Sequence, residues 1–119
     1  MGGPNFLYDE KNNFGNLTSA GDFPNTINMG EASAERMSVD LKLPDGPITG
    51  SVTLSITGSD TENGTYDTIV TGGSVSGVDI ANDGYGLPMP KTKFKFLKAS
   101  LAGSFVGTVQ AIINSYIGK

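Results

Sequence analysis

The stretch that decides the fold is Ile48 to Ser59, with the sequence I-T-G-S-V-T-L-S-I-T-G-S. From Gly50 onward, apolar Val52, Leu54 and Ile56 alternate with small serine and threonine residues. Successive side chains of a strand point to opposite faces, so this alternation predicts a β-strand with one buried face and one solvated face. Branched residues such as valine, isoleucine and threonine also favour the extended conformation.

The segment before it, Met37 to Leu43, has the same period of two, with apolar residues at every second position. The four residues between the two segments, Pro44-Asp45-Gly46-Pro47, form a dense turn signal. We therefore expect the two strands to pair as a hairpin.

The rest of the chain has the composition of a protein with many short strands, since its 119 residues include 17 glycines and 6 prolines. We expect loops over 12–25, 71–77, 81–90 and 100–104, and further strands over 26–29, 66–70, 78–80, 92–99 and 105–113. The last strand is apolar on both faces, which predicts burial on both, by the sheet and by a neighbouring element or partner chain. Together these segments predict one all-β domain, a jelly roll or β-sandwich of about eight short antiparallel strands.

Several classes of site are excluded by composition. The chain contains no cysteine and no histidine, so it has no disulfides, no thiolate metal sites and no histidine base or ligand. No apolar run reaches the ~18 residues that a membrane span needs, and the net charge of −4 does not favour nucleic acid. We therefore expect a protein that is not an enzyme, has no cofactor and binds neither a membrane nor, directly, nucleic acid.

The N-terminal residues 1–23 are polar and have few apolar side chains, which predicts a flexible arm ahead of a domain over residues 24–119. The exception is the apolar patch Phe6-Leu7-Tyr8. We expect this patch to anchor the arm on a neighbouring subunit or another protein partner.

Four of the eight basic residues lie between 91 and 98. Lys91, Lys93 and Lys95 alternate with Phe94 and Phe96, which predicts a strand with a stripe of lysines on one face and phenylalanines in the core on the other. The stripe has two interpretations, protection of an edge strand from aggregation and docking on an acidic partner.

The loop around Asn63-Gly64 carries three carboxylates, Asp60, Glu62 and Asp67. Calcium needs 6–8 oxygen ligands, and the spacing is not that of a helix–loop–helix calcium site. The favoured interpretation is a solvated turn, and no metal site is predicted.

In order and spacing, several of these segments resemble the small jelly-roll cement (decoration) proteins of tailed-bacteriophage capsids. The segments are N-T-I-N-M-G at 25–30, the two alternating strands, I-T-G-S-D-T-E-N-G-T-Y at 56–66, and residues 90–101 followed by G-T-V-Q-A-I at 107–112. The resemblance covers roughly residues 24–114, and the first 23 residues match no part of the family.

The resemblance implies a structural virion protein that binds the outside of a phage head and stabilises contacts between major capsid proteins. It implies a homo-oligomer, in the first place a trimer, that is made in the host cytoplasm and carried on the capsid exterior. The alternative is a non-catalytic β-sandwich module that binds carbohydrate or another cell-surface ligand.

Overall fold

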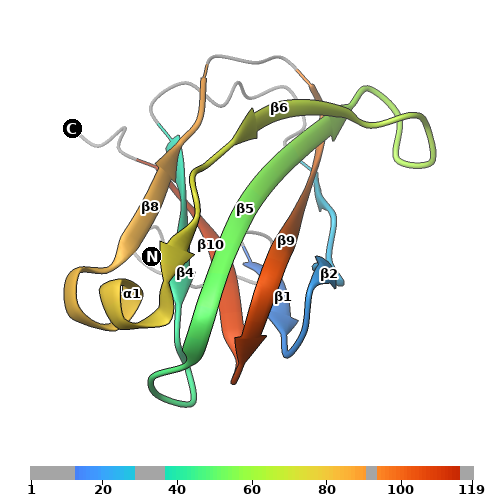
Figure 1. The fold of residues 1–119 in the computed structure, drawn as a ribbon. Helices are drawn as coiled ribbons and strands as arrows, with labels where there is room; N and C mark the ends of the chain where they lie inside the picture. Colours follow the sequence, from blue (N-terminus) through green and yellow to red (C-terminus); the bar gives the residue numbers. More distant parts are fainter. Residues whose placement is uncertain (1–12, 29–36, 91–93, 116–119) are drawn as a thin grey trace, which may run out of the picture.

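The computed structural model describes residues 13–28, 37–90 and 94–115. They form two antiparallel sheets packed face to face, with one short helix, α1, at one end (Figure 1). The first sheet contains, in spatial order, β1 (Asn13–Leu17), β10 (Val109–Ser115), β4 (Met37–Lys42) and β8 (Tyr85–Pro88). The second contains β2 (Gly21–Asp22), β9 (Phe96–Val106), β5 (Thr49–Ser59) and β6 (Asp67–Thr71), with β3 (Ile27–Asn28) beside β9 and β7 (Val75–Ser76) beside β5. The predicted β-sandwich is confirmed.

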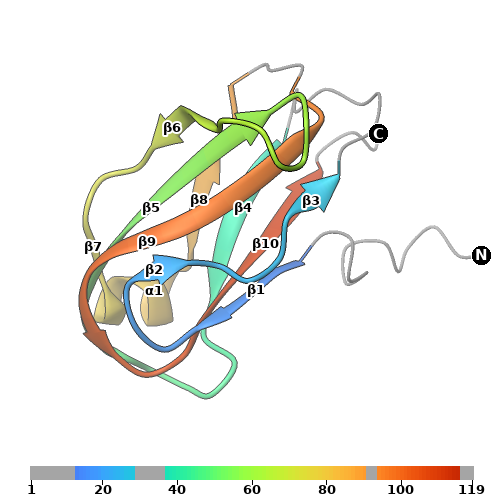
Figure 2. The same ribbon diagram turned by 90° about the vertical axis from the view of Figure 1, so that its right-hand side faces the viewer.

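The order of the strands is that of a jelly roll. The first strand of the chain pairs with the last, and the chain then passes repeatedly from one sheet to the other. The segment β2–β3 follows one edge of β9, while β6 and β7 follow one edge of β5. Each pair of short strands therefore occupies the place of one longer strand, and Figure 2 shows the two layers from the side.

The predicted hairpin between residues 37–43 and 48–59 is wrong, although both strands exist. β4 pairs with β10 and β8 in one sheet, whereas β5 pairs with β9, β6 and β7 in the other. The turn between them, closed by a hydrogen bond from Gly46 N to Leu43 O at 3.2 Å, carries the chain across the sandwich. A period of two identifies the buried face of a strand but not its neighbour, and in a sandwich strands of both sheets have one buried face.

The core lies between the sheets and is built from the alternating positions. Val52, Leu54 and Ile56 of β5 are each 0% exposed, as the sequence pattern predicts. Leu97, Ala99 and Leu101 of β9 face the same core.

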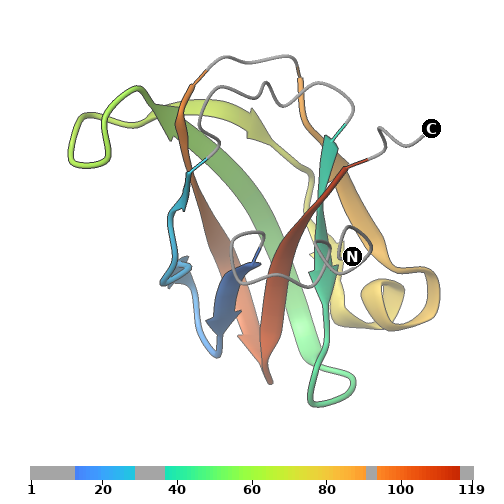
Figure 3. The same ribbon diagram turned by 180° about the vertical axis from the view of Figure 1, so that it is seen from behind.

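β10 is buried on both faces, as predicted. Val109, Ala111 and Ile113 face the core, while Ile112 lies on the other face of its sheet and is 8% exposed in the single chain. Figure 3 shows β10 between β1 and β4, so it is a central strand. The apolar character of this strand therefore does not require a partner chain.

The predicted strand over 78–80 is wrong, because these residues belong to α1 (Gly77–Asp83). Ser76 caps this helix, since its hydroxyl accepts a hydrogen bond from Asp79 N at 3.1 Å. Serine followed three residues later by an acidic residue is a helix-start signal, which a reading based on alternation alone does not detect.

The predicted loops over 71–77, 81–90 and 100–104 all contain strand residues, the first of them β7. β8 lies within the segment 81–90 and tolerates Pro88 because it is an edge strand. The predicted turn over 100–104 is instead the middle of β9, which runs unbroken for 11 residues opposite β5. Gly103 has φ +109° there, so the glycine marks a local distortion inside a strand.

The start of the fold also differs from the prediction. Residues 13–17 form β1 and residues 21–22 form β2, where a loop and part of an arm were expected. Phe14 is 0% exposed and Phe23 is 4% exposed, so residues 13–23 belong to the sandwich. Residues 1–12 of the predicted arm lie outside the described residues.

Candidate functional site

Most of the residues predicted to contact a partner lie outside the described residues: Phe6, Leu7, Tyr8, Lys91 and Lys93. The remaining one, Lys95, is exposed and directly precedes β9. The structure therefore gives no geometry for the lysine stripe as a whole.

The prediction that Phe94 and Phe96 both belong to the core is correct only in part. Phe94 is half-buried and packs against the core. Phe96 is the first residue of β9 and directly precedes buried Leu97. Successive side chains of a strand face opposite ways, so the Phe96 side chain lies on the outer face of the sheet. The alternation changes phase between Phe94 and Phe96, before β9 begins, and this sets the difference.

The loop between β5 and β6 is fixed on this outer face by Tyr66. Its hydroxyl donates to the Glu62 carbonyl oxygen at 2.8 Å, and the Lys98 ammonium lies 4.3 Å from the centre of its ring. Such a cation–π contact is favourable by about 0.5–1 kcal/mol at an exposed site. Desolvation, and second the nearby Glu62 carboxylate, raise the pKa of Tyr66 above its ordinary value. The loop is thus held in place while the Glu62 side chain stays exposed.

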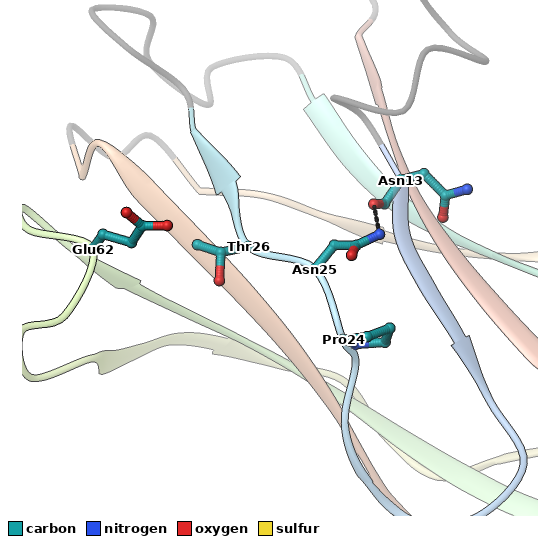
Figure 4. Close-up of a pocket in the computed structure, with 5 residues that line it drawn as sticks. All are labelled: Asn13, Pro24, Asn25, Thr26 and Glu62. Atoms are coloured by element: carbon teal, nitrogen blue, oxygen red, sulfur yellow. Dashed lines mark hydrogen bonds between the residues drawn. The ribbon is translucent and has the colours of Figure 1, made fainter.

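A polar groove of about 590 Å³ lies between this loop and the edge of the sandwich. The described residues that line it are Asn13, Pro24, Asn25, Thr26 and Glu62 (Figure 4). Asn25 and Glu62 are exposed, whereas Asn13 and Thr26 are half-buried. We call this feature the polar groove.

An arch in the chain forms one wall of the polar groove. Phe23 N donates to Ala99 O at 2.9 Å, and pairing with β9 resumes at Ile27 opposite Leu97. Residues 24–26 therefore leave the sheet opposite the single residue Lys98.

The arch crosses to the other sheet, where it is held by two hydrogen bonds. Asn25 N donates to Phe14 O at 2.9 Å, and Asn25 Nδ2 donates to Asn13 O at 3.1 Å. Gly15 makes room for it, because a Cβ atom at position 15 would lie 2.5 Å from Pro24 Cγ. The arch thus joins the two sheets at this side of the sandwich, and these contacts hold Pro24 and Asn25 in the wall of the groove.

The carboxylates around Asn63 do not form a cluster with other potential metal ligands. Within residues 13–28, 37–90 and 94–115, no three acidic side chains lie together in a way that could hold a metal ion. The same part of the chain has no helix long and apolar enough to cross a membrane.

The sequence-based prediction missed the polar groove because its residues are far apart in the chain. Asn13 and Asn25 fell in a segment expected to be a loop, and Glu62 was considered only as a possible metal ligand. Pro24-Asn25 is a recognisable interruption of a strand, but only the pairing of β1 and β9 with their neighbours brings it close to Glu62.

The chain is thus a jelly-roll β-sandwich, with the polar groove at the side where the arch joins the two sheets. Comparison of the chain with protein-family models and with curated proteins found no match.

Proposed function

We propose that this chain is a structural virion protein, a cement protein that binds the outside of a bacteriophage head. The observation that carries the proposal is that the segments resembling this family follow one another as parts of a single jelly roll. They supply β3, β4, β5, the β5–β6 loop, most of β9 and most of β10. The function itself rests on the resemblance, since many unrelated proteins share this fold.

The proposed mechanism is stabilisation by binding. A protein that binds the assembled shell, and not its separated subunits, lowers the free energy of the shell at every occupied site. At a free concentration of 100 times Kd, each site gains about 2.7 kcal/mol. Many copies on one head add these contributions.

The proposed partner surface includes the lysine stripe, Lys91, Lys93 and Lys95, facing acidic groups of the major capsid protein or of a neighbouring subunit. Exposed Lys95 is available for such a contact. Charge complementarity of this kind increases the rate and selectivity of association and is weakened by salt. A trimer is proposed from the resemblance alone, because the apolar residues of β10 are buried without a partner chain.

The experiment uses heads prepared without this protein and measures co-sedimentation of the added chain over a range of salt concentrations. Changing all three stripe lysines to glutamate should abolish binding and leave the melting temperature nearly unchanged, because exposed substitutions each cost within about 0.5 kcal/mol.

A matched control separates the location of the charge from its amount. Lys95→Glu and Lys42→Glu each reverse one exposed lysine, but Lys42 ends β4 in the other sheet. Lys95→Glu should weaken binding and Lys42→Glu should not. Wild-type occupancy of the triple variant at low salt would contradict a partner-binding role for the stripe.

A further inference from the structure

We infer that the polar groove is a binding site for a neutral saccharide. The inference does not rest on the proposed capsid role, because it depends only on the residues that line the groove. It concerns recognition of a sugar chain by hydrogen bonds and involves no reaction.

The lining offers a mixture of hydrogen-bonding groups. The Asn25 carboxamide supplies its oxygen as an acceptor, the Thr26 hydroxyl supplies a donor and an acceptor, and the Glu62 carboxylate supplies acceptors. The Asn13 carboxamide points away from Thr26 and Glu62, and its oxygen accepts from Gly15 N at 2.8 Å. Sugar hydroxyls need such a mixture of donors and acceptors. Among the residues that the structure describes, no basic side chain lines the groove. Together with the carboxylate and a net charge of −4, this disfavours a phosphate or another anion.

The backbone of both walls of the groove is already held in place in the unliganded chain. The arch is held by the hydrogen bonds of Asn25 to the first sheet and by close packing of Pro24 on Gly15. On the opposite wall, Tyr66 holds the Glu62 carbonyl, and Thr61 N donates to Ser59 Oγ at 3.2 Å. Pre-organised groups lose little conformational entropy on binding, which matters most for ligands that are themselves strongly hydrated.

The groove is large enough for a small ligand, and its polar groups are accessible. A volume of about 590 Å³ is within the usual range for small-molecule sites, which is about 300–1,000 Å³. Figure 4 shows the Glu62 carboxylate extending from its loop toward the side of the groove that carries Thr26 and Asn25. In the same view, the amide oxygen of Asn25 points away from its bond to Asn13. These groups are therefore placed to contact one ligand together.

The test begins with the full chain on an array of immobilised glycans, followed by titration with soluble maltotriose, cellotriose, chitotriose and mannotriose. Binding is measured by calorimetry and by amide chemical shifts. We expect at least one neutral glycan to bind at millimolar or lower concentration and to shift the amides of Asn25, Thr26 and Glu62. Inorganic phosphate should not bind, and a calcium chelator should change nothing.

Two variants locate the site, and one matched variant controls for charge. Glu62→Gln and Thr26→Ala should each weaken binding about tenfold, the usual effect of losing one hydrogen bond to a ligand. Asp45→Asn removes the same charge as Glu62→Gln from the turn at the opposite end of β5 and should bind as wild type (Figure 1).

Five results would overturn the inference. Three are the absence of binding to any neutral glycan, shifts confined to another part of the sandwich, and unchanged affinity of both groove variants when their spectra show an intact fold. The other two are binding that requires calcium and binding that prefers phosphate. None of these results bears on co-sedimentation with phage heads.

Discussion

Single residues decide how closely β5 and β9 approach, and Gly103 is the clearest case. It lies opposite Val52 with φ +109°, and a Cβ atom there would be 2.5 Å from the backbone oxygen of Ser51. Gly103→Ala therefore introduces both backbone strain and overlap with a backbone atom, which neither strand can relieve by changing a rotamer.

We predict that Gly103→Ala lowers the free energy of unfolding by about 2–4 kcal/mol, combining typical strain and overpacking costs. The measurement is urea denaturation monitored by circular dichroism. Gly73→Ala is the matched control, because a Cβ atom at position 73 meets nothing within 4 Å, and its stability should stay within about 0.5 kcal/mol of wild type. Equal effects of the two substitutions would contradict this account of β9.

Burial raises the pKa of Tyr85 above its ordinary value. The neutral phenol is therefore favoured in the folded state, and the unfolded chain loses its proton first, near pH 10. Stability from this group is complete below pH 10 and declines as the pH rises through the folded-state pKa. Tyr85→Phe should flatten the decline in unfolding free energy measured above pH 10, and an unchanged slope would exclude Tyr85 as its source.

At the scale of elements, α1 depends on its cap because it has only 7 residues. Ser76→Ala removes the acceptor for Asp79 N and should cost about 0.5–2 kcal/mol of stability. Hydrogen exchange should show faster exchange within α1, with β5 and β9 protected as before. Ser74→Ala, an exposed serine before β7, is the control and should change neither measurement.

Elements were predictable from the sequence where a strand has one buried face, as in β4 and β5. Their partners were not, because the same alternation fits a hairpin and a crossing between sheets. β1 was missed since only Phe14 of its five residues is buried, which gives no alternation to detect. The length of β9 was missed because Gly103 was interpreted as a turn.

The candidate site was even less predictable from the sequence than the pairing of the strands. The lysine stripe was predictable because its members are neighbours in the sequence, and it stays a prediction. The polar groove was not predictable, because Asn25 and Glu62 come together only through the pairing of β3 with β9 and β9 with β5. Residues joined by strand pairing leave no local pattern.

Across the whole molecule, β1 is the first element of the described part of the chain, which gives a sharp prediction for truncations. Deleting residues 2–10 stops before Asn13 and should leave the melting temperature nearly unchanged while weakening binding to heads. Deleting residues 2–17 also removes β1 with buried Phe14 and should unfold the domain or lower its stability by about 3–5 kcal/mol. Unfolding by the shorter deletion would show that residues 2–10 are part of the domain.

We propose that this chain occupies the outside of a phage head, and cryo-electron microscopy of heads produced with and without its gene is the direct test. We expect additional density on the outer surface, at gaps between major capsid proteins, into which the two-sheet sandwich fits in repeated copies. Heads with the gene should also withstand higher temperature than heads without it. Identical maps from the two preparations, with the chain recovered only as free protein, would contradict the claim.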